Sequence, residues 1–84
     1  MEKIQVAIMM GSKNDMPVVE ETAKMLESFG VGHEMKVLSA HRTPKETAAY
    51  AESLAERGVK VVICAAGGSA ALSGVVAAHT NIPV

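Results

Sequence analysis

Apolar and polar positions follow one another along the chain in three blocks of similar length. Each block has a short apolar run, a turn of small or polar residues and a stretch with helical periodicity. A block spans roughly 28 residues, which suits one unit of strand, loop and helix. The apolar runs lie at 3–10, 34–38 and 59–65. The pattern therefore predicts three strands that alternate with three helices, and the first strand is apolar enough to be buried on both faces.

The first helix is predicted from the spacing of its apolar residues. Val19, Ala23 and Leu26 recur at i, i+4 and i+7 and share one face of a helix. Asp15 stands where a capping side chain is expected, and the nearby proline fits the first helical turn. Gly30 is suited to end the helix in the left-handed conformation.

The second helix is predicted to begin at a capping box. The Thr43 hydroxyl can accept a hydrogen bond from the backbone N–H of Glu46, whose side chain can reach back to the cap. Gly58 is expected to end this helix. Its apolar face is expected to consist of Ala48, Ala51 and Ala55.

The third helix is rich in alanine and is expected to run from the loop 66–69 to about Thr80. Residues 82–84 then have the composition of the start of a fourth strand, at which the sequence stops. Strands that alternate with helices indicate a parallel sheet with right-handed crossovers, here as a single α/β domain over 1–84.

Parallel strands place every strand-to-helix loop at one edge of the sheet, where ligands bind in this class of fold. The loops 11–15, 39–44 and 66–69 should therefore lie close together in space although they are distant in the sequence. This convergence makes them the candidate functional site.

Composition limits the function classes. The chain has 84 residues, 49% of them hydrophobic, with one Phe, one Tyr and no Trp, so the core must be aliphatic. So small a core often needs support from partner subunits. The net charge of −1 argues against non-specific nucleic-acid binding, and no apolar run is long enough to cross a membrane. A single cysteine and no apparent signal peptide lead us to expect a reduced, cytoplasmic protein.

The first loop, 11–15, offers a site for an anion or a polyol. Its small residues let a ligand approach the backbone, and the following helix presents free N–H groups. Asp15 can also accept hydrogen bonds from sugar hydroxyls. Taken alone, the same residues are more typical of a plain capped turn, and they do not form a Walker A loop.

The second loop, 39–44, carries more chemical information. It places the His41 imidazole beside the Arg42 guanidinium just before a helix N-terminus. Arginine and a helix N-terminus both favour phosphate. The neighbouring positive charge favours the neutral imidazole, which can transfer a proton near pH 7. The alternative is a solvated loop in which Arg42 pairs with a nearby acid.

The third loop, 66–69, contains Gly67 and Gly68, which allow a ligand close to the backbone. It can border a planar base or a carboxylate, or its glycines can serve only a tight turn. Their spacing to Gly74 does not match a dinucleotide-binding fingerprint. His33, His79 and Cys64 have no partners at metal-ligand spacing, and we expect them to be structural or solvated.

Three ordered motifs resemble the 5-(carboxyamino)imidazole ribonucleotide mutases, also known as the catalytic subunit family of phosphoribosylaminoimidazole carboxylase. They are Val-Ala-Ile-Met-Met-Gly-Ser-Lys-Asn-Asp, Ser-Ala-His-Arg-Thr-Pro and Ala-Gly-Gly. The hexapeptide at 39–44 is the most specific, and the likeness covers essentially the whole chain as the N-terminal half of the family domain.

The resemblance implies a three-layer, flavodoxin-like parallel sheet that is incomplete in this chain. It further implies a homo-octamer with sites at subunit junctions, substrates that are derivatives of aminoimidazole ribonucleotide with carbon dioxide, and neither metal nor organic cofactor. His41 would carry the proton. Ser12, Asp15 and Arg42 would bind the ribose phosphate end of the substrate. Ser39, Gly67 and Gly68 would complete the substrate-binding site.

The chain departs from the usual family pattern at three positions. Asn14 stands where serine is usual, Ala71 where histidine is usual and Ser73 where proline is usual. The third loop is in this respect closer to the sister class that carboxylates aminoimidazole ribonucleotide directly, although that class usually has lysine in place of Arg42. Three hypotheses stay open: a mutase or direct carboxylase, a non-catalytic phosphoribosyl-binding relative, and a structural fragment ordered only by assembly.

Overall fold

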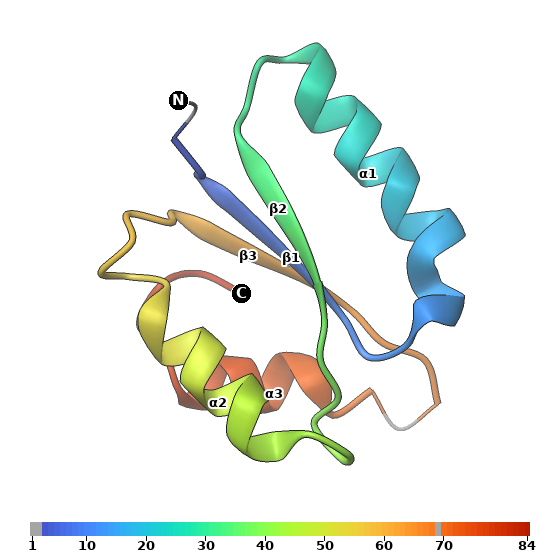
Figure 1. Ribbon diagram of the computed structural model, residues 1–84, viewed down its shortest axis with the longest axis vertical. Helices are drawn as coiled ribbons and strands as arrows, with labels where there is room; N and C mark the ends of the chain where they lie inside the picture. Colours follow the sequence, from blue (N-terminus) through green and yellow to red (C-terminus); the bar gives the residue numbers. More distant parts are fainter. Residues whose placement is uncertain (1–2, 69) are drawn as a thin grey trace.

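A parallel sheet forms the centre of the molecule in the computed structural model, which describes residues 3–68 and 70–84. Its strands are β1 (Val6–Met10), β2 (His33–Val37) and β3 (Val61–Ala65), in the order β2-β1-β3 (Figure 1). Both strand pairs are parallel and in continuous register over five residues. The predicted α/β class and the three predicted strands are confirmed, although β1 and β3 are shorter than predicted and β2 begins one residue earlier.

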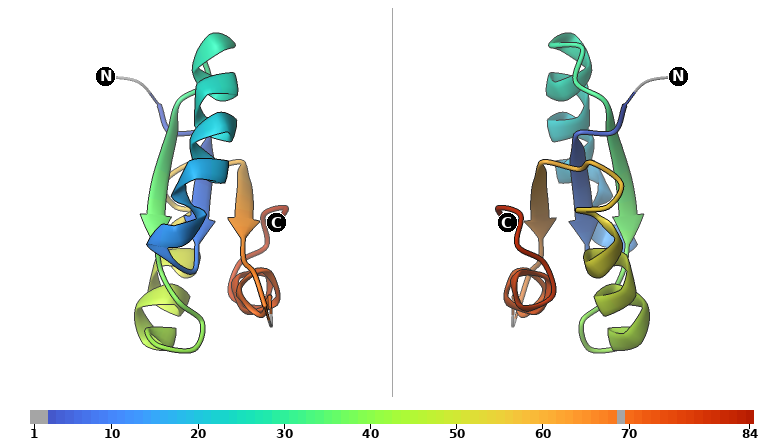
Figure 2. Two further views of the ribbon diagram at one scale, coloured as in Figure 1. Left: turned by 90° about the vertical axis from the view of Figure 1, so that its right-hand side faces the viewer. Right: turned by 90° about the vertical axis from the view of Figure 1, so that its left-hand side faces the viewer.

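The helices cover both faces of the sheet. They are α1 (Met16–Ser28), α2 (Pro44–Ser53) and α3 (Leu72–Ala78), and a short 3-10 helix, η1 (Lys13–Asp15), precedes α1. Figure 1 shows α1 on one side of the sheet and α2 with α3 on the other, and the two views onto the faces of the sheet agree (Figure 2). The arrangement has three layers, and the flavodoxin-like fold is confirmed.

The core is built around β1, whose residues are all buried. Because successive side chains of a strand point to opposite faces, Ala7 and Met9 pack with α2 and α3, whereas Ile8 and Met10 pack with α1. Burial of β1 on both faces confirms the prediction from its apolar run. The core is aliphatic on both sides of the sheet, as the composition required.

Helix faces and ends agree in part with the predictions. Val19, Ala23 and Leu26 of α1 do face the sheet. On α2, however, the predicted face was partly wrong: Ala51 is buried and Ala55 is exposed. The helix ends at Ser53, so Ala55 lies in the turn that follows and no longer shares a face with the residues before it.

Two predicted caps were wrong. Asp15 stands at the N-cap of α1 but its carboxylate makes no capping hydrogen bond, because η1 comes first and Ser12 caps that turn by accepting from the N–H of Asn14 at 3.2 Å. Thr43 makes no side-chain cap on α2, since its hydroxyl is bonded to Ser39 instead. The capping box with Glu46 is therefore not formed.

Gly30 ends the first helix as predicted, with a φ of 71°. Gly58 also has a left-handed conformation, with a φ of 82°, but it closes the turn after α2, which already ends at Ser53, so the predicted end of that helix was wrong. A third glycine, Gly32, is needed for a different reason. A β-carbon built on Gly32 would lie 2.1 Å from the backbone oxygen of Lys3, so no side chain fits between the chain leading into β2 and that leading into β1. This contact lies at the end of the sheet opposite the strand-to-helix loops.

The last residues lie beside β3. The predicted fourth strand over 82–84 is not formed as a strand, but the Val62 N–H donates to the Pro83 carbonyl at 2.9 Å, as a neighbouring parallel strand would accept. The third helix is also shorter than predicted, since α3 ends at Ala78 and not near Thr80.

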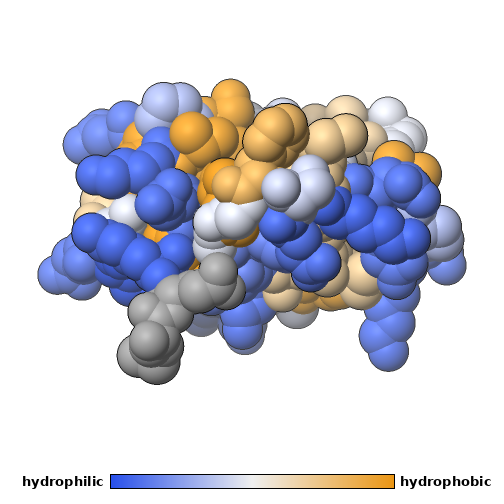
Figure 3. Space-filling view, turned by 90° about the horizontal axis from the view of Figure 1, so that it is seen from above, coloured by the Kyte–Doolittle hydropathy of each residue, from blue (hydrophilic) through white to orange (hydrophobic). Residues whose placement is uncertain are grey.

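Apolar side chains reach the surface in patches between charged ones (Figure 3). On α1 and at its C-cap these include Val18, Met25 and Phe29, each more than half exposed. None of the helices that the structure describes is both long and apolar enough to span a bilayer.

Candidate functional site

The three strand-to-helix loops meet around a pocket at the carboxyl ends of the strands, with a volume of about 360 Å³. The predicted convergence of the loops is therefore confirmed. The pocket is lined by Gly11, Ser12, Asn14, Asp15, Ser39, Ala40, His41, Ala66, Gly67, Ala70, Ala71 and Leu72.

The second loop, which comprises residues 39–43, is held by its own side chains. The Ser39 hydroxyl accepts hydrogen bonds from the backbone N–H groups of His41, at 3.2 Å, and Arg42, at 3.0 Å. Serine hydroxyls commonly stabilise turns in this way. The bond fixes the backbone from which the His41 imidazole projects.

Thr43 closes the same loop from its other end. Its hydroxyl accepts from the Ser39 N–H at 2.9 Å and donates to the Ser39 carbonyl at 3.1 Å, and its own N–H donates to that carbonyl at 2.9 Å. With both ends of the loop bonded to each other, few backbone conformations remain open to it. The second loop is thus shaped before any ligand binds.

The first loop leaves β1 at Gly11 and is tied to its neighbours through that residue. The Gly11 N–H donates to the carbonyl of Ala65 at the end of β3, at 3.3 Å. The Arg42 guanidinium donates to the Gly11 carbonyl, also at 3.3 Å. Arg42 thus connects the second loop to the first, and it is not among the residues that line the pocket.

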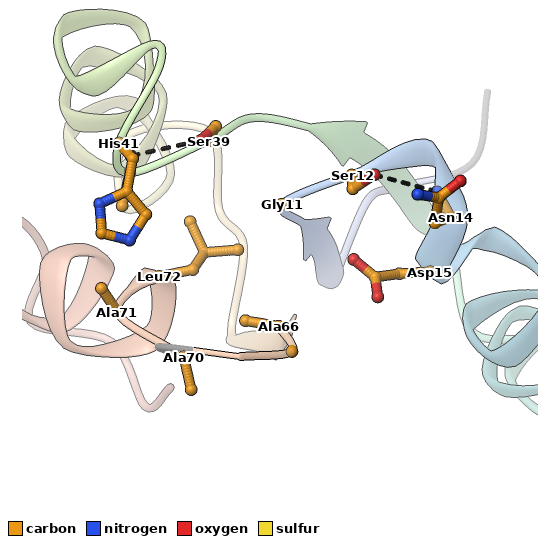
Figure 4. Close-up of a pocket in the computed structure, with 12 residues that line it drawn as sticks. Gly11, Ser12, Asn14, Asp15, Ser39, His41, Ala66, Ala70, Ala71 and Leu72 are labelled. Carbon is orange, nitrogen blue, oxygen red and sulfur yellow. Dashed lines mark hydrogen bonds between the residues drawn. The ribbon is translucent and has the colours of Figure 1, made fainter.

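Polar groups and the imidazole occupy different sides of the pocket. In the close-up, Ser12 and Asp15 lie together at the end of β1, and His41 lies across from them beside Ala71 and Leu72 (Figure 4). A ligand with a polar end and a reactive ring can therefore contact both sides at once.

The described residues of the third loop, 66–68 with 70 and 71, form an apolar wall of the pocket. Gly67 and Ala70 both line it, and the Ala70 N–H donates to the Gly67 carbonyl at 3.1 Å. A methyl group built on Gly67 or on Gly11 would meet no atom within 4 Å, so both positions leave open space. Gly68 has a φ of 56° and is not among the lining residues, and Ser69 lies outside the described residues.

The remaining candidate residues have structural environments. The His33 Nδ1 atom lies 3.2 Å from the Val31 carbonyl, to which it can donate, and His79 pairs with Glu52 at 3.1 Å. Cys64 packs against the core, and its burial raises the pKa of the thiol to about 11, which makes it a poor nucleophile at neutral pH. Within 3–68 and 70–84, no three His, Cys, Asp or Glu side chains are grouped to hold a metal ion.

An ionic cluster braces the two elements that carry the second loop. Glu34 of β2 receives two hydrogen bonds from the Arg57 guanidinium, at 2.6 and 2.8 Å, and a third from the Tyr50 hydroxyl of α2. The bonds from Arg57, with a smaller contribution from Tyr50, lower the pKa of Glu34 to about 2. Burial, followed by the nearby carboxylate, raises the pKa of Tyr50 above its ordinary range.

Two features of the site were missed from the sequence. Leu72 lines the pocket, next to the Ala71 that the family pattern had singled out, because α3 starts later than predicted, and the small residues before Leu72 were the available signal. Thr47 is buried on α2 and bonded to the second loop. The sequence feature that could have revealed it is its position four residues before Ala51, which places a polar residue on the apolar face of the helix.

Comparisons with known proteins agree on one family. The family model described as AIR carboxylase matches residues 5–84. The chain is 56% identical over 80 residues to the N5-carboxyaminoimidazole ribonucleotide mutase of Pyrococcus abyssi, covering 95% of this chain and 46% of that protein. It is 54% identical over 81 residues to the protein of the same name in Vibrio parahaemolyticus, covering 96% and 50%.

Solved structures give the same result. The crystal structure of a Treponema denticola PurE2 variant matches all of this chain and 56% of its own, with a TM-score of 0.86 and 32% identity. The Treponema denticola PurE structure matches 95% of this chain and 54% of its own, with a TM-score of 0.83 and 33% identity. The chain spans about half the length of the curated mutases it matches.

Proposed function

Because this chain belongs to the AIR carboxylase family, we propose that it is part of an enzyme of purine biosynthesis that interconverts N5-carboxyaminoimidazole ribonucleotide and 4-carboxy-5-aminoimidazole ribonucleotide. The enzyme would be an isomerase of the mutase type. The observation that carries the proposal is one pocket that combines the His41 imidazole with the polar groups of Ser12 and Asp15.

The polar side of the pocket is suited to the ribose phosphate. The Ser12 hydroxyl can donate to a phosphate or accept from a ribose hydroxyl, and Asp15 can accept from ribose hydroxyls. Arg42 supplies a planar guanidinium that pairs well with phosphate. It now donates to the Gly11 carbonyl, so we propose that it reaches phosphate by turning away from that bond while its backbone stays fixed by Ser39.

His41 is proposed as the proton carrier. Cleavage of the carboxyl–nitrogen bond releases carbon dioxide and leaves the bonding electrons on nitrogen, which takes a proton from the imidazolium. The ring carbon then attacks carbon dioxide, forms the new carbon–carbon bond and gives its proton to the neutral imidazole. One side chain thus serves both steps and returns to its starting state.

The third loop is proposed to border the imidazole and carboxyl groups. Gly67 and Gly68 leave the backbone accessible, and Ala70, Ala71 and Leu72 offer an apolar surface beside His41. Such a surface suits carbon dioxide, which is uncharged and must stay in the pocket between the two steps. Ser39 shapes the same region by fixing the His41 backbone.

We further propose that residues 1–84 form the N-terminal part of the family domain and that the protein acts in the cytoplasm as a homo-octamer with pockets at subunit junctions. The exposed apolar residues of α1 and its C-cap, which include Val18, Met25 and Phe29, support an assembled state. The proposed reaction requires proton transfer and retention of carbon dioxide, for which neither metal nor organic cofactor is needed.

A second candidate is direct carboxylation of aminoimidazole ribonucleotide by carbon dioxide. Ala71 lines the pocket beside His41 where a second imidazole is usual in the mutases, and this favours the sister class. The chain is also 49% identical over 79 residues to the chloroplastic phosphoribosylaminoimidazole carboxylase of Vigna aconitifolia, covering 14% of that protein. A non-catalytic phosphoribosyl-binding relative is the third candidate, again because of Ala71.

Turnover of both substrates separates these candidates. The purified protein is given the carboxyamino substrate without bicarbonate, or aminoimidazole ribonucleotide with bicarbonate, and the 4-carboxy product is followed. The mutase forms product in the first assay, the direct carboxylase only in the second, and a binding protein in neither. His41→Asn should bind substrate with little change while turnover falls by at least roughly 100-fold. Arg42→Ala should weaken binding, and full activity of His41→Asn would refute the proposed mechanism.

A further inference from the structure

Thr47 is the one polar side chain among the fully buried residues of the described chain. It lies on the face of α2 that packs toward the sheet, one turn before Ala51 and two turns before Leu54. An apolar side chain of the same shape would fit that face without needing a hydrogen bond. The hydroxyl therefore requires an explanation.

The hydroxyl lies near two carbonyl oxygens. It donates to the Thr43 carbonyl at 2.8 Å, which is the usual partner of a threonine in a helix, four residues back. It also lies 3.2 Å from the Ser39 carbonyl, eight residues back and outside the helix. A hydroxyl has a single proton, so Thr47 shares it between the two carbonyls, and the second contact ties α2 to a residue outside the helix.

That second contact reaches the residue that organises the second loop. The Ser39 carbonyl also receives the N–H and the hydroxyl of Thr43, and the Ser39 hydroxyl holds the backbone of His41. Thr47 is rigid, because it is fully buried in the helix. A fixed point on α2 is thereby linked through Ser39 to the imidazole in the pocket.

We propose that Thr47 is a positioning residue for the reaction, which sets the place of His41 through the Ser39 carbonyl. This rests on the proposed function of His41. Removal of the Thr47 hydroxyl should leave the chain folded. The second loop, and with it the His41 imidazole, should then be able to shift in the pocket. Shifts on the order of 1 Å can reduce turnover by up to roughly 100-fold.

Two variants of the same position test the proposal in the assembled, active protein. Thr47→Val keeps the shape and removes the hydroxyl, and Thr47→Ser keeps the hydroxyl and removes the methyl group. We expect kcat of Thr47→Val to fall between roughly tenfold and 100-fold while KM changes less than about threefold, and kcat of Thr47→Ser to stay near that of the parent. If Thr47→Val keeps the parent kcat, or if both variants lose it equally, the proposal is wrong.

Nuclear magnetic resonance separates this result from a failure of the proposed function. The imidazole signals of His41 and the amide signals of residues 39–43 should move in Thr47→Val and return in Thr47→Ser, whether or not the protein turns over. An inactive parent whose loop signals respond in this way would refute the mutase function and retain the positioning role. Unchanged loop signals in Thr47→Val would refute the positioning role itself.

Discussion

The second and third loops face the same pocket, yet they are built in opposite ways. The second loop, 39–43, is bonded end to end by Ser39 and Thr43 and is anchored to α2 by Thr47. In the described part of the third loop, 66–71, the structure gives one internal bond, from the Ala70 N–H to the Gly67 carbonyl. The second loop is polar and shaped by its side chains, whereas the third loop consists of glycine and alanine around Ser69.

The same contrast extends to the elements that carry each loop. β2 and α2 are joined across the surface by Glu34, Arg57 and Tyr50. β3 and α3 meet through apolar side chains such as Val62 and Val76. A side chain that transfers protons needs a fixed position, and a surface that only borders a ring or carbon dioxide needs little beyond space. If the proposed function is correct, the two constructions reflect these two tasks.

Among the changes that test this difference between the second and third loops, removal of the Thr43 hydroxyl should have the largest effect on stability. Thr43→Val leaves the Ser39 N–H without its acceptor, so we expect the free energy of unfolding to fall by about 2 kcal/mol. Urea denaturation monitored by circular dichroism measures the loss. Thr43→Ser, which keeps the hydroxyl, is the control at the same position.

Gly67→Ala is the matched change in the third loop, and it should alter stability by less than about 0.5 kcal/mol because the methyl group meets no atom within 4 Å. Equal losses in Thr43→Val and Gly67→Ala would mean that the two loops do not differ in the way described.

The next largest effect is expected from acid, which should weaken the ionic cluster that joins β2 to α2. The pKa of Glu34 is about 2 in the folded protein and near its ordinary value of 4.5 in the unfolded chain. The folded state therefore gains full stability from this carboxylate above about pH 4.5 and loses it as the pH falls toward 2. Because the Glu34 and Arg57 side chains are 23% and 40% exposed, water screens the pair, and we expect the loss to be about 1 kcal/mol.

Denaturant titrations at several pH values between 2 and 6 follow this loss. In Glu34→Gln, whose amide does not titrate, the acid-dependent part assigned to Glu34 should vanish. A variant that kept the full acid dependence would show that other carboxyl groups cause it.

The smallest effect is expected in the third loop. Ala70 has a φ of 50°, a left-handed conformation that disfavours alanine relative to glycine by roughly 1 kcal/mol. Ala70→Gly removes this cost, but glycine has greater freedom in the unfolded chain, which offsets part of the benefit. The substitution should therefore stabilise the fold by about 0.5 kcal/mol. Thermal unfolding measures the change, and a loss of stability would argue that Ala70 makes contacts worth more than its strain.

Much of this architecture follows from the order of apolar runs and turns. The spacing of the runs predicted the strands, and the geometry of parallel sheets predicted that the loops containing Ser12, His41 and Gly67 would meet. These predictions were correct because they depend on topology, which tolerates an error of one or two residues at the end of an element. The terminal shifts of β1 and β3 changed none of them.

The predictions that failed depended on a choice between local alternatives. The Thr43 hydroxyl could bond forward to the helix or back to Ser39, and both partners are close in sequence. Ala55 was placed on a helix face because periodicity does not show where a helix stops. Such choices are decided by the packing around the loop, which a linear pattern of residue types does not contain.

The contact between Gly32 and Lys3 has a consequence for protein engineering. Among the glycines, the one that accepts least change lies at the far end of the sheet, where a single methyl group would strike a carbonyl oxygen. At the pocket, a methyl group fits on Gly11 or Gly67 without striking anything. Libraries that reshape ligand specificity can therefore introduce alanine at those two glycines without a clash in the protein, provided that the distant one is left untouched.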